Sequence, residues 1–144
     1  MIDFHAHIIP FIDDGAKDAT EAIQMLQMIK AQGADLVVAT PHFYGETMSV
    51  EDFLHKRNEA FLYLKQEAAA VTAPLPEIVL GAEVCFSYEI MEINHIDKLC
   101  IENTKSLLIE FSNDVWHEWV CDFLSYLVNE KKITPVVAHF ERLL

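Results

Sequence analysis

Short apolar runs alternate with longer amphipathic segments along this chain. The runs lie at 1–5, 36–40, 78–80, 106–110 and 133–138. Their length and their content of branched apolar residues predict buried strands. The longer segments, at 18–32, 49–71 and 114–130, repeat apolar residues every three or four positions, as one face of a helix does. Strands that alternate with helices predict an α/β fold built on a parallel sheet.

Local signals mark the boundaries of several segments. Asp18 and Glu21 form a capping pair at the start of the first helix, and Gly33 is suited to its end. We expect an irregular connection at 73–76 and a weaker helical piece at 88–97.

Metal-ligating residue types fall at the carboxyl ends of all the predicted strands. They are His5, His7, His42, Glu83, Glu110 and His139. The carboxyl ends of parallel strands meet at one edge of an α/β fold, which is where active sites of barrel-like folds are built. The helical stripes carry none of these residues. The pattern therefore predicts a metal centre rather than scattered surface histidines.

The donor types indicate which chemistry such a centre supports. His5 and His7 are two positions apart on a strand, so both rings point the same way and can reach one ion. Imidazole together with carboxylate suits Mn, Fe or Zn better than Ca or Mg. Two or more ions can hold a phosphate, and a metal-activated water can attack it in line. Arg142, three residues after His139, is placed to bind phosphate oxygens.

Two adjacent carboxylates compete for one role. Asp14 precedes Gly15 and is the candidate ligand, but Asp13 is an alternative ligand, and Asp14 could also be a turn former.

Other phosphatase chemistries lack their motifs. A cysteine-based tyrosine phosphatase needs Arg six residues after the cysteine, and no Gly-rich phosphate loop or D-x-D nucleophile occurs.

Composition narrows the class of protein further. The 144 residues are 52% hydrophobic and 23% charged, which is typical of one folded domain. The net charge of −13 disfavours nucleic acid as a partner. No apolar run reaches the roughly 18 residues of a membrane span, and the first residues lack a basic segment, so we expect a cytoplasmic protein without a signal peptide. Cys85, Cys100 and Cys121 are expected to be free, mostly buried thiols.

The motifs, taken in order, resemble those of the bacterial protein-tyrosine phosphatases of the PHP superfamily that belong to capsule and exopolysaccharide operons. They are Asp3-Phe4-His5-Ala6-His7, Ile12-Asp13-Asp14-Gly15-Ala16-Lys17-Asp18, Ala39-Thr40-Pro41-His42, Gly81-Ala82-Glu83, Leu108-Ile109-Glu110-Phe111 and Ala138-His139-Phe140-Glu141-Arg142. The resemblance covers nearly the whole chain. It implies a distorted (β/α)7 barrel, of which residues 1–144 hold the N-terminal part with the first five β/α units.

The resemblance also implies a three-metal centre that is usually supported by Mn²⁺, with Fe, Zn and Mg as alternatives. By position, His5, His7 and Glu83 would hold the first ion. Glu83 would bridge to the second ion, which Glu110 and His139 share. Asp14 and His42 would hold the third. Arg142 matches a phosphate-binding arginine and, with His139, is the expected catalytic residue. The implied substrate is phosphotyrosine on a bacterial tyrosine kinase that controls polysaccharide export.

Two departures from the family pattern keep alternatives open. Phe140 stands where the family usually has Pro, and the later Asp-x-His motif is not found before Leu144. The alternatives are a phosphatase for a small ester such as histidinol phosphate and a truncated, inactive metal-binding or interaction module. Five strands are also too few to close a barrel, so we expect an open sheet edge through which copies of the chain can associate.

Overall fold

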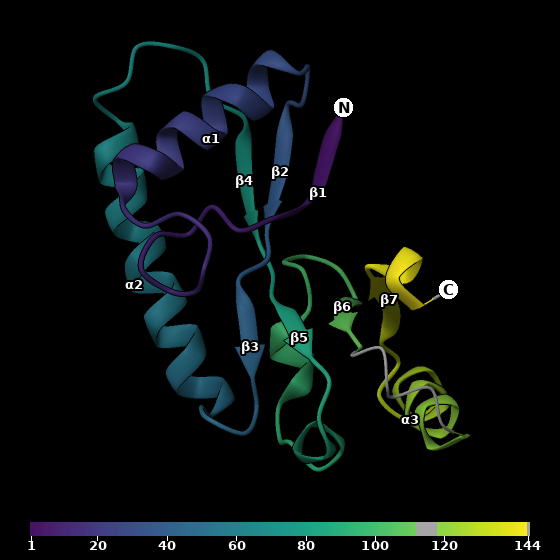
Figure 1. The fold of residues 1–144 in the computed structure, drawn as a ribbon. Helices are drawn as coiled ribbons and strands as arrows, with labels where there is room; N and C mark the ends of the chain where they lie inside the picture. Colours follow the sequence, from purple (N-terminus) through teal and green to yellow (C-terminus); the bar gives the residue numbers. More distant parts are fainter. Residues whose placement is uncertain (112–117, 144) are drawn as a thin grey trace. The chain divides into compact units, whose positions relative to one another are not determined.

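The computed structural model describes residues 1–111 and 118–143, and its elements follow the predicted alternation of strands and helices (Figure 1). The strands are β1 (Ile2–Ala6), β2 (Leu36–Ala39), β3 (His42–Tyr44), β4 (Glu77–Leu80), β5 (Glu83–Cys85), β6 (Ser106–Glu110) and β7 (Thr134–Ala138). The α-helices are α1 (Ala19–Ala31), α2 (Val50–Ala68) and α3 (Glu118–Asn129). Three short 3-10 helices are η1 (Tyr88–Met91), η2 (Ile96–Leu99) and η3 (Phe140–Leu143). The predicted start of the last helix, at 114, lies outside the described residues.

The chain divides into two compact units. The first comprises residues 1–42 and 51–80, and its sheet has the order β1-β2-β4 with both pairs parallel. Apolar side chains from α1, β2, α2 and β4 fill one core, among them Leu26, Val37, Leu64 and Leu80. The inward faces of both helices are therefore those that the apolar spacing predicts.

The boundaries of α1 follow from its capping residues. The Asp18 side chain accepts a hydrogen bond from the backbone N–H of Glu21, and the Glu21 carboxylate accepts one from the N–H of Lys17. These bonds satisfy amides that would otherwise lack partners in the first helical turn. After α1, Gly33 adopts a φ of 91°, a conformation that glycine reaches without strain. The predicted start and stop of this helix are confirmed.

The second unit comprises residues 43–50 and 81–144. Its sheet has the order β3-β5-β6-β7, although His42, the first residue of β3, groups with the first unit. β5 pairs with β6 and β6 pairs with β7, in both cases in parallel. α3 packs beside β7 (Figure 1), and Val120, Phe123 and Leu127 are buried on its inner face. This register brings the carboxyl ends of β5, β6 and β7 to one edge.

The single five-stranded sheet expected from the sequence is wrong. The described residues form two sheets instead. The prediction missed β3 and β5, and both of these strands belong to the second sheet. Each missed strand has three residues, which is too short for an apolar alternation to stand out. Each also follows a break: Pro41, which has no N–H to donate, precedes β3, and Gly81 precedes β5. The helix expected at 88–97 consists of the short pieces η1 and η2 instead.

The cysteines agree with the prediction except in one respect. All three are free, and Cys100 is buried and Cys85 partly buried, but Cys121 is exposed. Cys121 lies on the outer side of α3, next to the buried Val120, so the local apolar composition misled the prediction for this residue. In the part of the chain that the structure describes, no helix has both the length and the apolarity that crossing a bilayer demands.

Candidate metal centre

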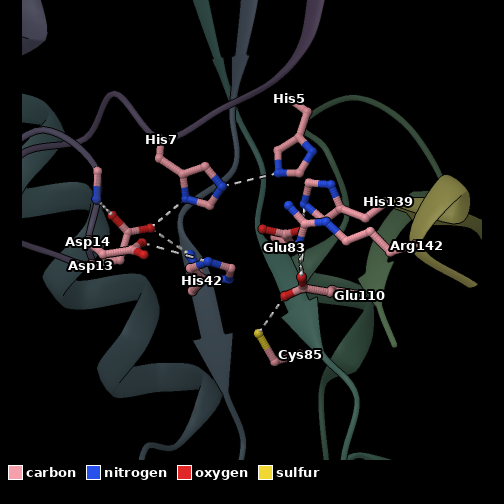
Figure 2. Close-up of polar contacts among 11 residues, drawn as sticks. His5, His7, Asp13, Asp14, His42, Glu83, Cys85, Glu110, His139 and Arg142 are labelled. Atoms are coloured by element: carbon pink, nitrogen blue, oxygen red, sulfur yellow. Dashed lines mark hydrogen bonds and ion pairs between the residues drawn. The ribbon is translucent and has the colours of Figure 1, made fainter. Parts of the chain in front are cut away.

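In the first unit, two histidine rings face one another at the end of β1. His5 lies within β1 and His7 follows it, and their Nε2 atoms are 3.1 Å apart (Figure 2). The alternation of side chains along an extended backbone puts both rings on the same side, as predicted. Two Nε2 atoms this close suit an ion that shares both nitrogens, because neutral imidazole is a good ligand for transition metals.

Asp13 holds the His7 ring in place. Its Oδ2 atom lies 2.8 Å from His7 Nδ1 and also accepts a hydrogen bond of 2.9 Å from the backbone N–H of His42. Its Oδ1 atom accepts the backbone N–H of Gly15 at 3.0 Å. Burial alone would raise the pKa of Asp13, but the hydrogen bonds from His7, His42 and Gly15 outweigh it and lower the pKa below 3.8. The ionised carboxylate fixes the proton on Nδ1 and leaves Nε2 open to a metal.

The neighbouring Asp14 is placed differently. Its side chain is 86% exposed, and its Oδ1 atom lies 3.8 Å from His42 Nε2. Ligand atoms of His7, Asp14 and His42 all lie within 4.8 Å of one another. Asp13 is occupied by three hydrogen bonds, so the geometry favours Asp14 as the ligand and Asp13 as its support. The sequence favoured Asp14 and kept Asp13 as an alternative, and the position of Asp13 in the loop supports that order.

Gly15 allows the loop to close on His7. A Cβ atom at this position would lie 2.2 Å from the carbonyl oxygen of His7 and 2.5 Å from its Cβ. The same His7 carbonyl accepts a hydrogen bond of 3.0 Å from the N–H of Ala16. Glycine is therefore required by a close approach of two backbone segments.

In the second unit, three ligand types come from adjacent parallel strands. Glu83 begins β5 and is fully buried, Glu110 ends β6, and His139 follows β7. His139 Nε2 lies 3.2 Å from Glu83 Oε1 and 3.9 Å from Glu110 Oε1 (Figure 2). The strand register pairs Glu110 with Ala138, so His139 is carried just past the end of β6. A buried carboxylate beside a second carboxylate and an imidazole is a donor set that a divalent ion satisfies well.

Arg142 is brought to the same cluster by the turn that follows His139. His139 has a φ of 52°, and its carbonyl accepts the N–H of Arg142 at 2.8 Å as η3 begins. The guanidinium Nη1 atom then lies 3.4 Å from Glu110 Oε1, and the Arg142 side chain is 58% exposed. An exposed guanidinium beside the cluster is available to a phosphate from solvent.

Cys85 is the residue of this cluster that sequence reasoning missed. Its Sγ atom lies 3.6 Å from Glu110 Oε2. Burial, together with the charges of Glu110 and Glu83, raises the pKa of Cys85 to about 12, although a hydrogen bond with Tyr44 opposes the shift. A strand beginning at Glu83 would have revealed Cys85, because positions two apart share a face.

The predicted ligand set of His5, His7 and Glu83 contains residues of both units, and it stays a prediction.

Comparisons with known proteins agree with the motifs. The family described as "Capsular polysaccharide synthesis, CpsB/CapC" matches residues 1–144. Tyrosine-protein phosphatase CpsB of Streptococcus agalactiae serotype V is 33% identical over 144 residues, covering 99% of this chain and 57% of its own. Tyrosine-protein phosphatase YwqE of Bacillus subtilis is 31% identical over 147 residues, covering 99% of this chain and 55% of its own.

A solved structure has a similar fold. It belongs to a study of YwqE from Bacillus subtilis and CpsB from Streptococcus pneumoniae, described as unique metal-dependent tyrosine phosphatases. It superposes with a TM-score of 0.78 at 30% identity and covers 99% of this chain and 56% of that one. The predicted PHP-type α/β fold is thereby confirmed. The chain spans little more than half the length of the curated relatives it matches.

Proposed function

This chain belongs to the CpsB/CapC family of capsular polysaccharide synthesis, and from that premise we propose that it is part of a metal-dependent protein-tyrosine phosphatase. One observation carries the proposal: His139 Nε2 lies near both Glu83 and Glu110, with Arg142 beside Glu110. Two carboxylates, an imidazole and a guanidinium are the parts that a metal-assisted phosphate hydrolysis needs.

The residues of each unit have separate tasks in this proposal. His7, Asp14 and His42 would hold an ion in the first unit, and Glu83, Glu110 and His139 would hold one in the second. His5 would contribute to the ion in the first unit, because its Nε2 atom lies 3.1 Å from that of His7. Bound ions supply an activated water and a clamp on phosphate oxygens, and we take Mn²⁺ as the ion. Asp13 keeps the tautomer of His7 that offers Nε2.

Arg142 acts on the substrate rather than on the ions. Its guanidinium offers paired N–H donors to phosphate oxygens and offsets the charge that develops on them in the transition state. Its ion pair with Glu110, at 3.4 Å, is partly exposed and therefore weak, so the side chain can exchange that carboxylate for a phosphate.

The proposed substrate is phosphotyrosine on a bacterial tyrosine kinase that regulates capsule or exopolysaccharide synthesis. The names of the relatives support phosphotyrosine, and the family description supports the link to capsule synthesis; the kinase is the part that we add. A cytoplasmic location belongs to the same proposal, and the free cysteines fit a reducing compartment. Association of copies through an open sheet edge is a further part, which a mass measurement in solution can check.

The test is hydrolysis of p-nitrophenyl phosphate, of a phosphotyrosine peptide and of histidinol phosphate, with added Mn²⁺ and with EDTA. We expect turnover that requires Mn²⁺ and falls more than about 100-fold in His139→Ala, because a ligand contributes more than its outer-shell partners. His55→Ala is the matched control, since that histidine is exposed on α2 and pairs with Glu59. Faster hydrolysis of histidinol phosphate than of the phosphotyrosine peptide would indicate a phosphatase for a small ester instead. Mn²⁺ binding without turnover of any ester would make the chain a metal-binding module.

A further inference from the structure

The two carboxylate oxygens of Glu110 face different partners. Oε1 lies 3.9 Å from His139 Nε2 and 3.4 Å from Arg142 Nη1. Oε2 accepts a hydrogen bond from the Cys85 thiol, with Sγ at 3.6 Å. Figure 2 shows the thiol on the side of this carboxylate away from His139. The carboxylate is thus oriented by different groups at its two ends.

The strand pairing explains why the thiol reaches this oxygen. β5 and β6 are parallel, and Cys85 is the direct partner of Glu110 in their register. Cys85 is also two positions after Glu83, which puts both side chains on one face of β5. The backbone N–H of Phe86, the residue after Cys85, donates to the carbonyl of Glu110 at 2.8 Å and fixes the two strand ends together. The contact therefore follows from the sheet rather than from a mobile loop.

A carboxylate without this contact has more freedom. The terminal torsion of a glutamate side chain is broad, so its two oxygens exchange places readily unless a partner holds one of them. A thiol is a weak hydrogen-bond donor, but a weak bond suffices to favour one orientation over another of nearly equal energy. Outer-shell partners of metal-ligating carboxylates commonly affect metal affinity by about 10–100-fold.

We propose that Cys85 is a positioning residue of the metal centre in the second unit, holding Glu110 Oε2 so that Oε1 faces His139. The inference rests on the proposed function, because it takes Glu110 as a metal ligand. In this proposal the thiol acts through Glu110, whose Oε2 it contacts, rather than as a ligand of the ion that Glu83, Glu110 and His139 would hold. Its absence lowers the affinity for Mn²⁺ without abolishing binding.

The experiment measures Mn²⁺ affinity by calorimetry in the full chain and its variants. Cys85→Ala and Cys85→Val both remove the donor, and Val keeps the space filled. We expect each to weaken binding about tenfold, the lower end of outer-shell effects. Cys85→Ser keeps a hydroxyl donor and is expected to stay within about threefold of the original chain. Cys100→Ala, at a buried cysteine of the same unit, is the matched control and should leave the affinity unchanged.

Two further measurements separate the possible failures. Thermal unfolding in EDTA shows whether a variant loses affinity only because it has lost its fold. The Mn²⁺ affinity of Glu110→Gln shows how much is lost when the proposed ligand itself is changed. If this variant loses Mn²⁺ while the Cys85 variants bind like the original chain, the positioning role is overturned and the metal site stands. If Glu110→Gln also binds normally, the proposed metal site fails. If Cys85→Ala loses Cd²⁺ far more than Mn²⁺, the thiol is a ligand and the positioning role is again overturned.

Discussion

The two units hold their ligand residues by different means. In the first unit the donors include His7, Asp14 and His42, and a loop brings them together through hydrogen bonds to Asp13. In the second unit Glu83, Glu110 and His139 sit at the ends of neighbouring strands whose register sets their spacing. The first set is rich in nitrogen and depends on one turn. The second is rich in oxygen and depends on a sheet.

This contrast indicates where each site is vulnerable. A turn can be broken by one substitution, since few contacts define it, whereas a strand register is supported by every pair along the ladder. The first site is also more open, because Asp14 is 86% exposed while Glu83 is fully buried. The following substitutions test the contrast, in order of decreasing effect.

Gly15→Ala should affect the first unit most. The added Cβ would overlap the backbone of His7, so the turn must shift, and we expect a loss of about 1–3 kcal/mol in the free energy of unfolding. Chemical denaturation measures this loss, and the ring signals of His7 and His42 in an NMR spectrum should move while that of His139 stays. Gly33→Ala is the control. Its added Cβ would meet no atom within 4 Å, but the φ of 91° strains any residue other than glycine, so it should lower stability and leave the His7 and His42 signals unchanged. An unchanged His7 signal in Gly15→Ala would contradict the turn's role.

Asp13→Asn should weaken the first site without removing a ligand. An amide holds His7 Nδ1 less firmly than a carboxylate, so we expect Mn²⁺ affinity to fall about 10–100-fold. Calorimetry measures the change, and Asp14→Asn is the comparison. Asp14→Asn should have the larger effect, because Asp14 is the assigned ligand. The reverse order would make Asp13 the ligand and Asp14 a turn former.

Asp35→Asn should have the smallest effect and leave both metal sites alone. A hydrogen bond from Lys30 is the main cause that lowers the pKa of Asp35, and its Oδ1 lies 2.6 Å from Lys30 Nζ. A carboxyl whose pKa is lower in the folded state stabilises the fold above its unfolded pKa, near 3.8, and loses that contribution as pH falls below it. Melting temperatures of the two chains should differ slightly at neutral pH and converge in strong acid. A difference that grew with acid would contradict this sign.

The predictions from sequence succeeded where several residues carried one signal. β6 was predicted at its observed bounds, because three apolar residues, Leu107 to Ile109, precede a lone carboxylate, Glu110. The start of α1 was found because Asp18 and Glu21 satisfy its first amides. The candidate ligands Glu83, Glu110 and His139 lie together because parallel strands end at one edge, and their binding of a metal stays a prediction.

What the sequence missed depended on geometry that no short pattern encodes. β5 has three residues, so Glu83 was taken as a residue after a strand and its strand neighbour Cys85 was overlooked. Preferring Asp14 to Asp13 depends on which carboxylate the loop buries in hydrogen bonds, which here is Asp13, and residue type alone does not reveal it. The division into two sheets likewise follows from three-residue strands after Pro41 and Gly81.

The left-handed backbone at His139 has a practical consequence for protein engineering. A φ of 52° is tolerated by glycine and asparagine, but it costs other residues roughly 1–2 kcal/mol and is worst for branched ones. A variant designed to test the proposed phosphatase activity by losing the His139 imidazole must keep the loop that carries Arg142. Asparagine at position 139 is therefore a better choice than valine or isoleucine, because it removes the imidazole and preserves the backbone of this loop.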